Sequence, residues 1–187
     1  MKKLISKNYL NKVYLNFKSI EEIRDEISEA INVCLKSIKR KNKIIFCGNG
    51  GSAADSLHLS AELVGKFLKK RKSIPSISLA SNTSILTSLS NDFSYKIIFK
   101  RQIESLGLKG DVLFAISTSG KSENVNLAVK YALSKKMSVI YLTSIKCNMK
   151  KRKNLHFIKV KANRVDRIQE QHIAIGHIIC EFLENSC

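Results

Sequence analysis

His58 and Glu62 have the residue types and the spacing that acid–base or metal chemistry needs. They are four residues apart in a segment whose apolar pattern predicts a helix, so their side chains lie one above the other on one face. An imidazole and a carboxylate placed in this way can bind a metal ion or share a proton transfer. A surface pair without any function has the same spacing and is the commoner case. The neighbouring segments must therefore show whether this pair belongs to a site.

A glycine-rich turn lies directly before this helix. Ile44–Cys47 is an apolar run that predicts a buried strand, and Gly48–Ser52 ends it abruptly. We expect Ser52 to cap the following helix, with Asp55 in its first turn. A strand, a glycine turn and a helix N-terminus together present backbone N–H groups that suit a phosphate. The turn matches neither the G-x-G-x-x-G pattern nor a P-loop, and a tight connection without a ligand is the alternative.

A second loop of the same design follows a later strand. Val112–Ile116 is a continuous apolar run, and Ser117–Ser122 then supplies hydroxyl groups and one glycine before a helix at Glu123–Lys135. In a parallel sheet both loops leave from the carboxyl ends of strands, where ligands of such sheets bind. The alternative is an ordinary serine-rich turn in which Ser122 caps the helix.

Strands and helices alternate along the chain, and these elements hold the two loops in place. Beyond the segments already named, strands are predicted at Ser76–Leu79, Ser138–Leu142 and His156–Val160, and helices at Ser84–Leu89, Tyr95–Leu106 and Ile168–Leu183. Two helices precede the first strand, one within residues 1–18 and one at Ile20–Ile38 that begins with a Ser19/Glu22 capping box. This alternation predicts an α/β fold with a doubly wound, mostly parallel five-stranded sheet.

Length and charge limit the classes of protein. The 187 residues suffice for one α/β domain, so we expect a single domain with a helical extension at 1–40 and a core at 41–187. The net charge of +18 by itself suggests a nucleic-acid partner. The cations are spread over the chain, however, and aromatic residues do not alternate with the denser runs at Lys66–Lys72 and Lys146–Lys153 to form a stacking surface. We therefore expect no nucleic-acid partner, and a lysine-rich surface that attracts anionic substrates.

The cysteines and the hydropathy predict a cytoplasmic enzyme or binding protein. The five cysteines are widely spaced and form no C-x-x-C pair, which argues against a disulfide framework or a zinc knuckle; they are Cys34, Cys47, Cys147, Cys180 and Cys187. No apolar run reaches the length of a membrane span, and the N-terminus lacks a hydrophobic signal core. We expect reduced thiols and no membrane partner.

Four segments together resemble the phosphoheptose isomerase branch of the SIS (sugar isomerase) family. They are CGNGGSAADSLHLSAEL at Cys47–Leu63, LSNDF at Leu89–Phe93, AISTSGKSENV at Ala115–Val125 and DRIQEQHIAIGHIICEFLE at Asp166–Glu184. The resemblance implies a flavodoxin-like sheet and a homotetramer with sites between subunits. It also implies sedoheptulose 7-phosphate as substrate and D-glycero-D-manno-heptose 7-phosphate as product, at the first step of heptose synthesis for surface polysaccharide.

The resemblance also implies the roles of particular residues. One Zn²⁺ per subunit would be bound by His58, Glu62, Gln169 and His177. Besides His58, Glu62 and Gln169, the substrate would contact Asn49, Gly50, Gly51, Ser52, Asn91, Asp92, Ser117, Thr118, Ser119, Ser122 and Asp166. The chain departs from the family at the basic segment Ile145–Asn154 and at Lys161-Ala162, where loop shape is in question.

An aldose–ketose isomerisation needs one group to take a proton from carbon and another to complete the transfer through an enediol. Our hypothesis is that Glu62 is the general base and His177 the complementary acid or base, with a metal ion polarising the carbonyl. Gln169 and His177 are eight residues apart, about 12 Å of rise on a continuous helix. Either Gln169 lies at a frayed helix start or two subunits form the site, and we predict the second. His172 is predicted to be a packed or interfacial side chain, and Cys47 a small buried one.

Three other functions compete with this hypothesis. The main one is a non-catalytic SIS regulator that binds a sugar phosphate and a protein partner such as a replication initiator. The presence of both Glu62 and His177 favours the enzyme. An enzyme or binding module for another sugar phosphate, and a nucleic-acid-binding protein, are the remaining alternatives.

Overall fold

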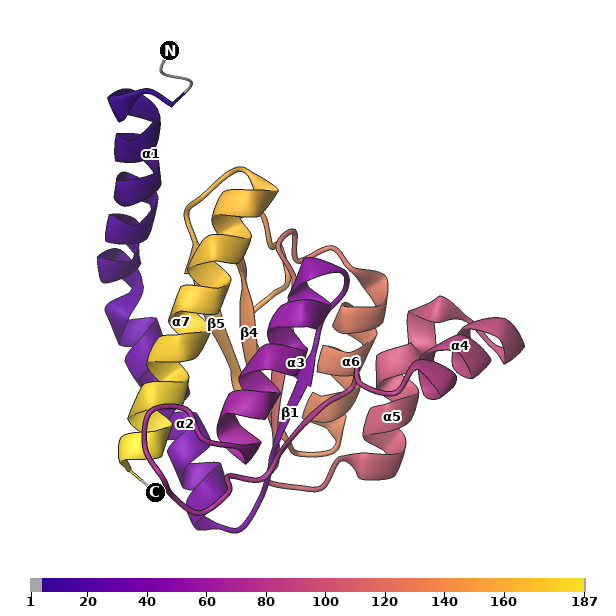
Figure 1. Cartoon of the computed structure of the whole chain (residues 1–187). Helices are drawn as coiled ribbons and strands as arrows, with labels where there is room; N and C mark the ends of the chain where they lie inside the picture. Colours follow the sequence, from indigo (N-terminus) through magenta and orange to yellow (C-terminus); the bar gives the residue numbers. More distant parts are fainter. Residues whose placement is uncertain (1–4, 187) are drawn as a thin grey trace.

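The chain forms a five-stranded parallel sheet with helices on both faces (Figure 1). The structure is a computed structural model that describes residues 5–186, so residues 1–4 of the first predicted helix and Cys187 lie outside the described residues. In spatial order the strands are β2 (Ser76–Ser78), β1 (Ile44–Cys47), β3 (Val112–Ile116), β4 (Ser138–Ser144) and β5 (Leu155–Val160). The order 2-1-3-4-5 is flavodoxin-like, as predicted, and reverses between β1 and β3.

The strands are apolar on both sides because two helical layers cover them. Phe46 and Phe114 face one layer, and their neighbours Ile45 and Leu113 face the other. One layer contains α2 (Arg24–Lys39), α3 (Gly51–Val64) and α7 (Val165–Asn185), and the other contains α5 (Ile98–Leu106) and α6 (Glu123–Ser134). The remaining helical segments are α1 (Lys7–Lys18), η1 (Ser19–Ile23), α4 (Thr83–Asp92) and η2 (Tyr95–Ile97). The predicted α/β architecture, with helices before β1 and a long closing helix, is confirmed.

Two predicted helix caps are wrong. Ser19 opens a short 3₁₀ helix, and α2 begins only at Arg24. The Ser19 hydroxyl instead donates to the carbonyl of Asn16 and accepts from the side chain of Gln171 on α7. Before α3 the cap is Gly50, whose φ of 55° places it in a backbone region that favours glycine. Ser52 is therefore a buried residue inside the first turn.

The N-terminal helix α1 packs only lightly on the body of the protein. It lies outside α7 and has no buried residue (Figure 1). Several of its large apolar side chains face solvent; they are Tyr9, Leu10, Tyr14, Leu15 and Phe17. Among the described helices, none has both the length and the apolar character to cross a bilayer.

Candidate active site

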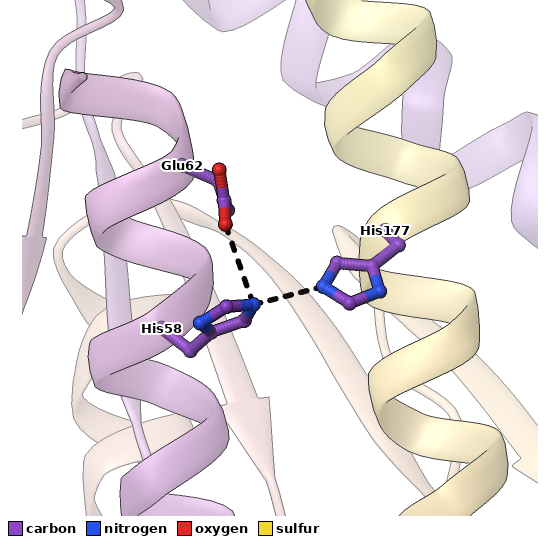
Figure 2. Close-up of side chains that lie close together, drawn as sticks. All are labelled: His58, Glu62 and His177. Carbon is purple, nitrogen blue, oxygen red and sulfur yellow. Dashed lines mark hydrogen bonds and ion pairs between the residues drawn. The ribbon is translucent and has the colours of Figure 1, made fainter. Parts of the chain in front are cut away.

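Helices α3 and α7 lie side by side and run in the same direction, and the candidate site lies between them (Figures 1 and 2). Their close approach depends on Gly176, because a Cβ at that position would lie 2.5 Å from Cδ1 of Leu59. Leu59 is one residue after His58, and Gly176 is one residue before His177. The contact between Leu59 and Gly176 thus brings two histidines from distant parts of the sequence to the same level.

Three side chains converge between the two helices, as Figure 2 shows. The Nε2 atoms of His58 and His177 are 2.9 Å apart, and His58 Nε2 is 3.4 Å from a carboxylate oxygen of Glu62. One ligand atom from each of the three residues lies within 4.8 Å of the others. The side chain of His58 is 49% exposed and that of Glu62 is 20% exposed, so a small molecule can reach the cluster from solvent.

The surroundings favour the neutral form of His177. Burial lowers the pKa of its imidazole, and the adjacent His58 lowers it further, while the Glu62 carboxylate opposes both effects. The ring of Phe67 stacks on His177 with a centroid distance of 5.6 Å and an interplanar angle of 23°. A neutral imidazole has a free lone pair, which can accept a proton or bind a cation.

The two polar loops follow the carboxyl ends of the neighbouring strands β1 and β3. The side chain of Asn49 exchanges hydrogen bonds with that of Asn124 at 2.8 and 2.9 Å and accepts another from the Tyr95 hydroxyl at 2.8 Å. In the second loop the hydroxyls of Ser117 and Ser122 are 3.1 Å apart. Because β1 and β3 flank the reversal of strand order, the loops occupy the position where such sheets bind ligands.

Comparison with known proteins identifies the family. A profile of the SIS domain matches residues 8–144. A phosphoheptose isomerase of a Nitratiruptor species is 45% identical over 166 residues, which are 89% of each chain. The chain belongs to the phosphoheptose isomerases of the SIS domain family. Their solved structures agree closely: the enzyme from Neisseria gonorrhoeae has a TM-score of 0.88 at 34% identity, with 95% of this chain and 96% of that one covered. The enzyme from Francisella tularensis has a TM-score of 0.89 at 27% identity, with 95% of both chains covered.

The donor set fits the zinc ion expected for a phosphoheptose isomerase. Two imidazole nitrogens and one carboxylate form a typical three-residue zinc site that keeps a position open. Two Nε2 atoms that face each other at 2.9 Å must share a proton or a cation, since two lone pairs would repel. The residues present can therefore hold a divalent ion.

Gln169, the fourth ligand expected from the family, lies elsewhere in this chain. Its amide nitrogen packs on Gly51, where a Cβ would come within 2.0 Å of it. Gly51 and Gln169 are seven and eight residues before His58 and His177, so the amide is about 10 Å from the cluster along the helix axes. A single chain therefore brings three of the four expected ligands together, and Gln169 joins the glycine loop instead.

Three further residues expected to contact substrate are not brought to the cluster. Asn91 and Asp92 hydrogen-bond to each other at the end of α4, on the opposite side of the molecule from α7 (Figure 1). Asp166 lies in the first turn of α7, where its carboxylate is 2.6 Å from the Arg164 guanidinium. In this chain these carboxylates and the amide are thus remote from the two imidazoles.

The structure also adds residues to which the sequence analysis assigned no role in the site. Asp55 lies one turn before His58, and burial raises the pKa of its carboxyl to about 6, against the opposing effect of His58. One oxygen of this carboxyl is buried without a hydrogen-bond partner. Its spacing of three residues from His58 was a usable signal. The sequence holds no comparable signal for Tyr95, Asn124 or Phe67, because their contacts with the loops and with His177 are long-range.

His172 and Cys47 are packed side chains, as predicted. His172 is fully buried, its Nε2 lies 3.2 Å from the carbonyl of Thr143, and burial lowers its pKa to about 4. Cys47 is also fully buried, and burial raises the pKa of its thiol to about 12, which keeps it protonated at neutral pH. Neither group can serve as an acid, base or nucleophile for a substrate.

Proposed function

We propose that this chain is a phosphoheptose isomerase that interconverts sedoheptulose 7-phosphate and D-glycero-D-manno-heptose 7-phosphate. The observation that carries the proposal is the convergence of His58, Glu62 and His177 in a chain so similar to phosphoheptose isomerases. A sugar-phosphate regulator needs the phosphate loops, but it has no need for a carboxylate beside two imidazoles. The product would supply heptose units for surface polysaccharide.

The phosphate end of the substrate would bind at the two loops. Backbone N–H groups around Gly50 and Gly51 at the N-terminus of α3, and the hydroxyls of Ser117–Ser122, supply donors for a dianion. We assign Asn49, Ser52, Thr118 and Ser119 to the same task. Gly51 lies about 10 Å along α3 from His58, on the order of the length of an extended seven-carbon sugar phosphate. The carbonyl end of the sugar can thus approach the cluster while the phosphate remains in the loops.

Glu62 and His177 would move the protons. The Glu62 carboxylate takes the proton from the carbon beside the carbonyl and returns it to the neighbouring carbon. Where no ion occupies its Nε2, the neutral imidazole of His177 accepts the hydroxyl proton and delivers it to the other oxygen. Zn²⁺ held by His58, Glu62 and His177 would occupy that nitrogen and would instead supply positive charge that stabilises the anionic oxygens of the enediolate. The stacked ring of Phe67 excludes water from one face of His177.

A homotetramer with sites between subunits is the working form that we propose. An apolar groove of about 750 Å³ runs between η1, α2 and α7 and is lined by Phe17, Ile20, Ile27, Ile31, Ile178 and Phe182 among others. Further large apolar side chains on α1 are exposed to solvent. In a closed symmetric oligomer, this apolar surface of one copy would pack against the same surface of a second copy.

One assay tests the proposed reaction. The purified protein is incubated with sedoheptulose 7-phosphate, and formation of the aldose is followed with and without a chelator. We expect turnover that falls on chelation and returns with Zn²⁺. No aldose formation under any metal condition would contradict the isomerase and favour the regulator. Turnover that persists after complete metal removal would contradict only the role of the ion.

A further inference from the structure

The segment that leaves α3 is held against α7 by two buried charged residues, Arg71 and Glu184. The Arg71 guanidinium donates to three main-chain carbonyls at the end of α3, those of Glu62 (2.7 Å), Leu63 (2.8 Å) and Gly65 (3.0 Å). The last carbonyls of a helix have no partner within the helix, so Arg71 serves as a C-terminal cap for α3. One of these carbonyls belongs to Glu62 itself, which fixes the backbone of the proposed base.

Glu184 on α7 completes this arrangement. Its carboxylate accepts the main-chain N–H groups of Phe67 (3.2 Å), Leu68 (2.8 Å) and Lys69 (3.1 Å), and an oxygen lies 3.3 Å from Nε of Arg71. The side chains of Arg71 and Glu184 are only 5% and 1% exposed. Burial opposes ionisation of this carboxyl, but the three N–H groups and Arg71 outweigh it and hold its pKa below the usual value.

These contacts reach the candidate site at three points. Glu184 is seven residues, two helical turns, after His177, so both side chains emerge on the face of α7 that meets α3. The ring of Phe67, whose N–H binds Glu184, stacks on the imidazole of His177. The pair thus fixes the distance between α3 and α7, the backbone of Glu62 and the ring that orients His177.

We propose that Arg71 and Glu184 are positioning residues for the His58–Glu62–His177 site. This inference rests on the proposed function, because it takes the three side chains to act together on a cation and a sugar. If the pair only stabilised the fold, its loss would lower the free energy of unfolding and leave the properties of the folded site unchanged. As positioning residues, their loss also weakens ion binding and lowers kcat more than it changes KM, since the phosphate loops are remote.

The chain contains a matched control for this distinction. Asp111 is a second buried carboxylate, with a side chain 1% exposed, that pairs with Lys43 at 2.6 Å. It also accepts the main-chain N–H groups of Lys43 and Leu108. Asp111 directly precedes β3, so it lies at the amino-terminal ends of the strands, opposite the loops. Asp111→Asn removes a comparable buried charge without touching α3 or α7.

The test compares Glu184→Gln, Arg71→Lys and Phe67→Leu with Asp111→Asn and the unaltered chain. Each protein is freed of metal, its folding is checked by circular dichroism, and its Zn²⁺ dissociation constant is measured by competition with a chromophoric chelator. The visible spectrum of the Co²⁺-loaded protein reports the geometry of the site. We expect Zn²⁺ binding about tenfold weaker in Glu184→Gln and Arg71→Lys, with an altered Co²⁺ spectrum and a smaller change in Phe67→Leu. Asp111→Asn should lose stability but bind Zn²⁺ as the unaltered chain does.

Two results would overturn the inference. One is an unchanged Zn²⁺ affinity in the folded Arg71→Lys and Phe67→Leu proteins. These two variants test the positioning role even if Glu184→Gln does not fold. The other is an equal loss of affinity in Asp111→Asn, which would show that global stability alone controls the site. An unaltered chain that neither binds Zn²⁺ nor isomerises the sugar would overturn the proposed function as well.

Discussion

The chemistry of the site is concentrated in one carboxylate and one imidazole that approach from different helices. Glu62→Gln keeps the shape of the side chain and removes its basicity. We expect turnover of sedoheptulose 7-phosphate to fall by about 10²–10⁴-fold, the usual contribution of a well-placed base. Glu181 is an exposed carboxylate one turn after His177 on α7. As a control, the Glu181→Gln variant should keep full activity. Near-normal turnover by Glu62→Gln would remove this residue from the mechanism.

Asp55 makes the stability of the protein depend on pH. Its folded pKa of about 6 lies above the ordinary value, so the folded chain binds a proton more tightly than the unfolded chain. The free energy of unfolding should therefore fall as pH rises from about 4 to about 6 and be independent of this group above that range. Asp55→Asn should stabilise the metal-free protein by about 1 kcal/mol at pH 7.5, allowing for solvent screening, and hardly at all at pH 4. Urea denaturation at both pH values measures this, and an equal effect at both would contradict it.

At this scale the sequence predicts residues whose partners are near in the chain. The His58/Glu62 pair follows from helical spacing alone. Only the family resemblance indicates His177, because nothing local connects it to a helix more than a hundred residues earlier. Arg71 lies in a basic run, and nothing in the sequence shows that its charge is buried against Glu184.

Helices α3 and α7 form the scaffold of the site because they stay in register along their length. Gly51 meets Gln169 and Leu59 meets Gly176, about two helical turns apart on each helix. Two turns further along α7, Glu184 meets Phe67, which lies just past the end of α3. Gly176→Ala should force the helices apart, because all three nearest atoms belong to the buried Leu59 side chain. We expect a loss of about 1–3 kcal/mol in stability and a loss of activity. Denaturation and turnover assays measure both effects.

A second substitution tests the cause of that loss. Leu59→Ala in the Gly176→Ala background makes room for the new methyl group, so the double variant should be more active than Gly176→Ala alone. If the two losses simply add, the spacing of the helices is not what the glycine controls.

Element type was easier to predict than element boundaries. Long apolar runs between helical patterns identify β1, β3 and β4, because a sheet covered on both faces must be apolar throughout. The caps at Ser19 and Ser52 were wrong for a different reason. A capping serine matches a local pattern, whereas the actual starts depend on the positive φ of Gly50 and on the contact of Gln171 with Ser19.

At the scale of the whole molecule, the position of Gln169 requires a second copy of the chain if this residue is to be a fourth ligand. Within one chain its amide lies against Gly51, about 10 Å from the imidazoles. A homotetramer can supply Gln169 from a neighbour, and the apolar groove beside α2 and α7 shows a surface on which copies can associate. The sequence alone could raise this question through the spacing of eight residues but could not place the amide.

Subunit mixing tests this arrangement directly. Glu62→Gln and Gln169→Ala chains are each expected to be nearly inactive as pure assemblies. If each site takes Glu62 from one chain and Gln169 from another, about a quarter of the sites in randomly mixed assemblies contain both intact residues. Activity should then return when the two proteins are unfolded, mixed and refolded together, and light scattering should show a tetramer. Chains refolded separately and then combined serve as the control. Mixed tetramers without recovered activity would show that each site draws both residues from one chain, which the packing of Gln169 on Gly51 allows only if the side chain moves.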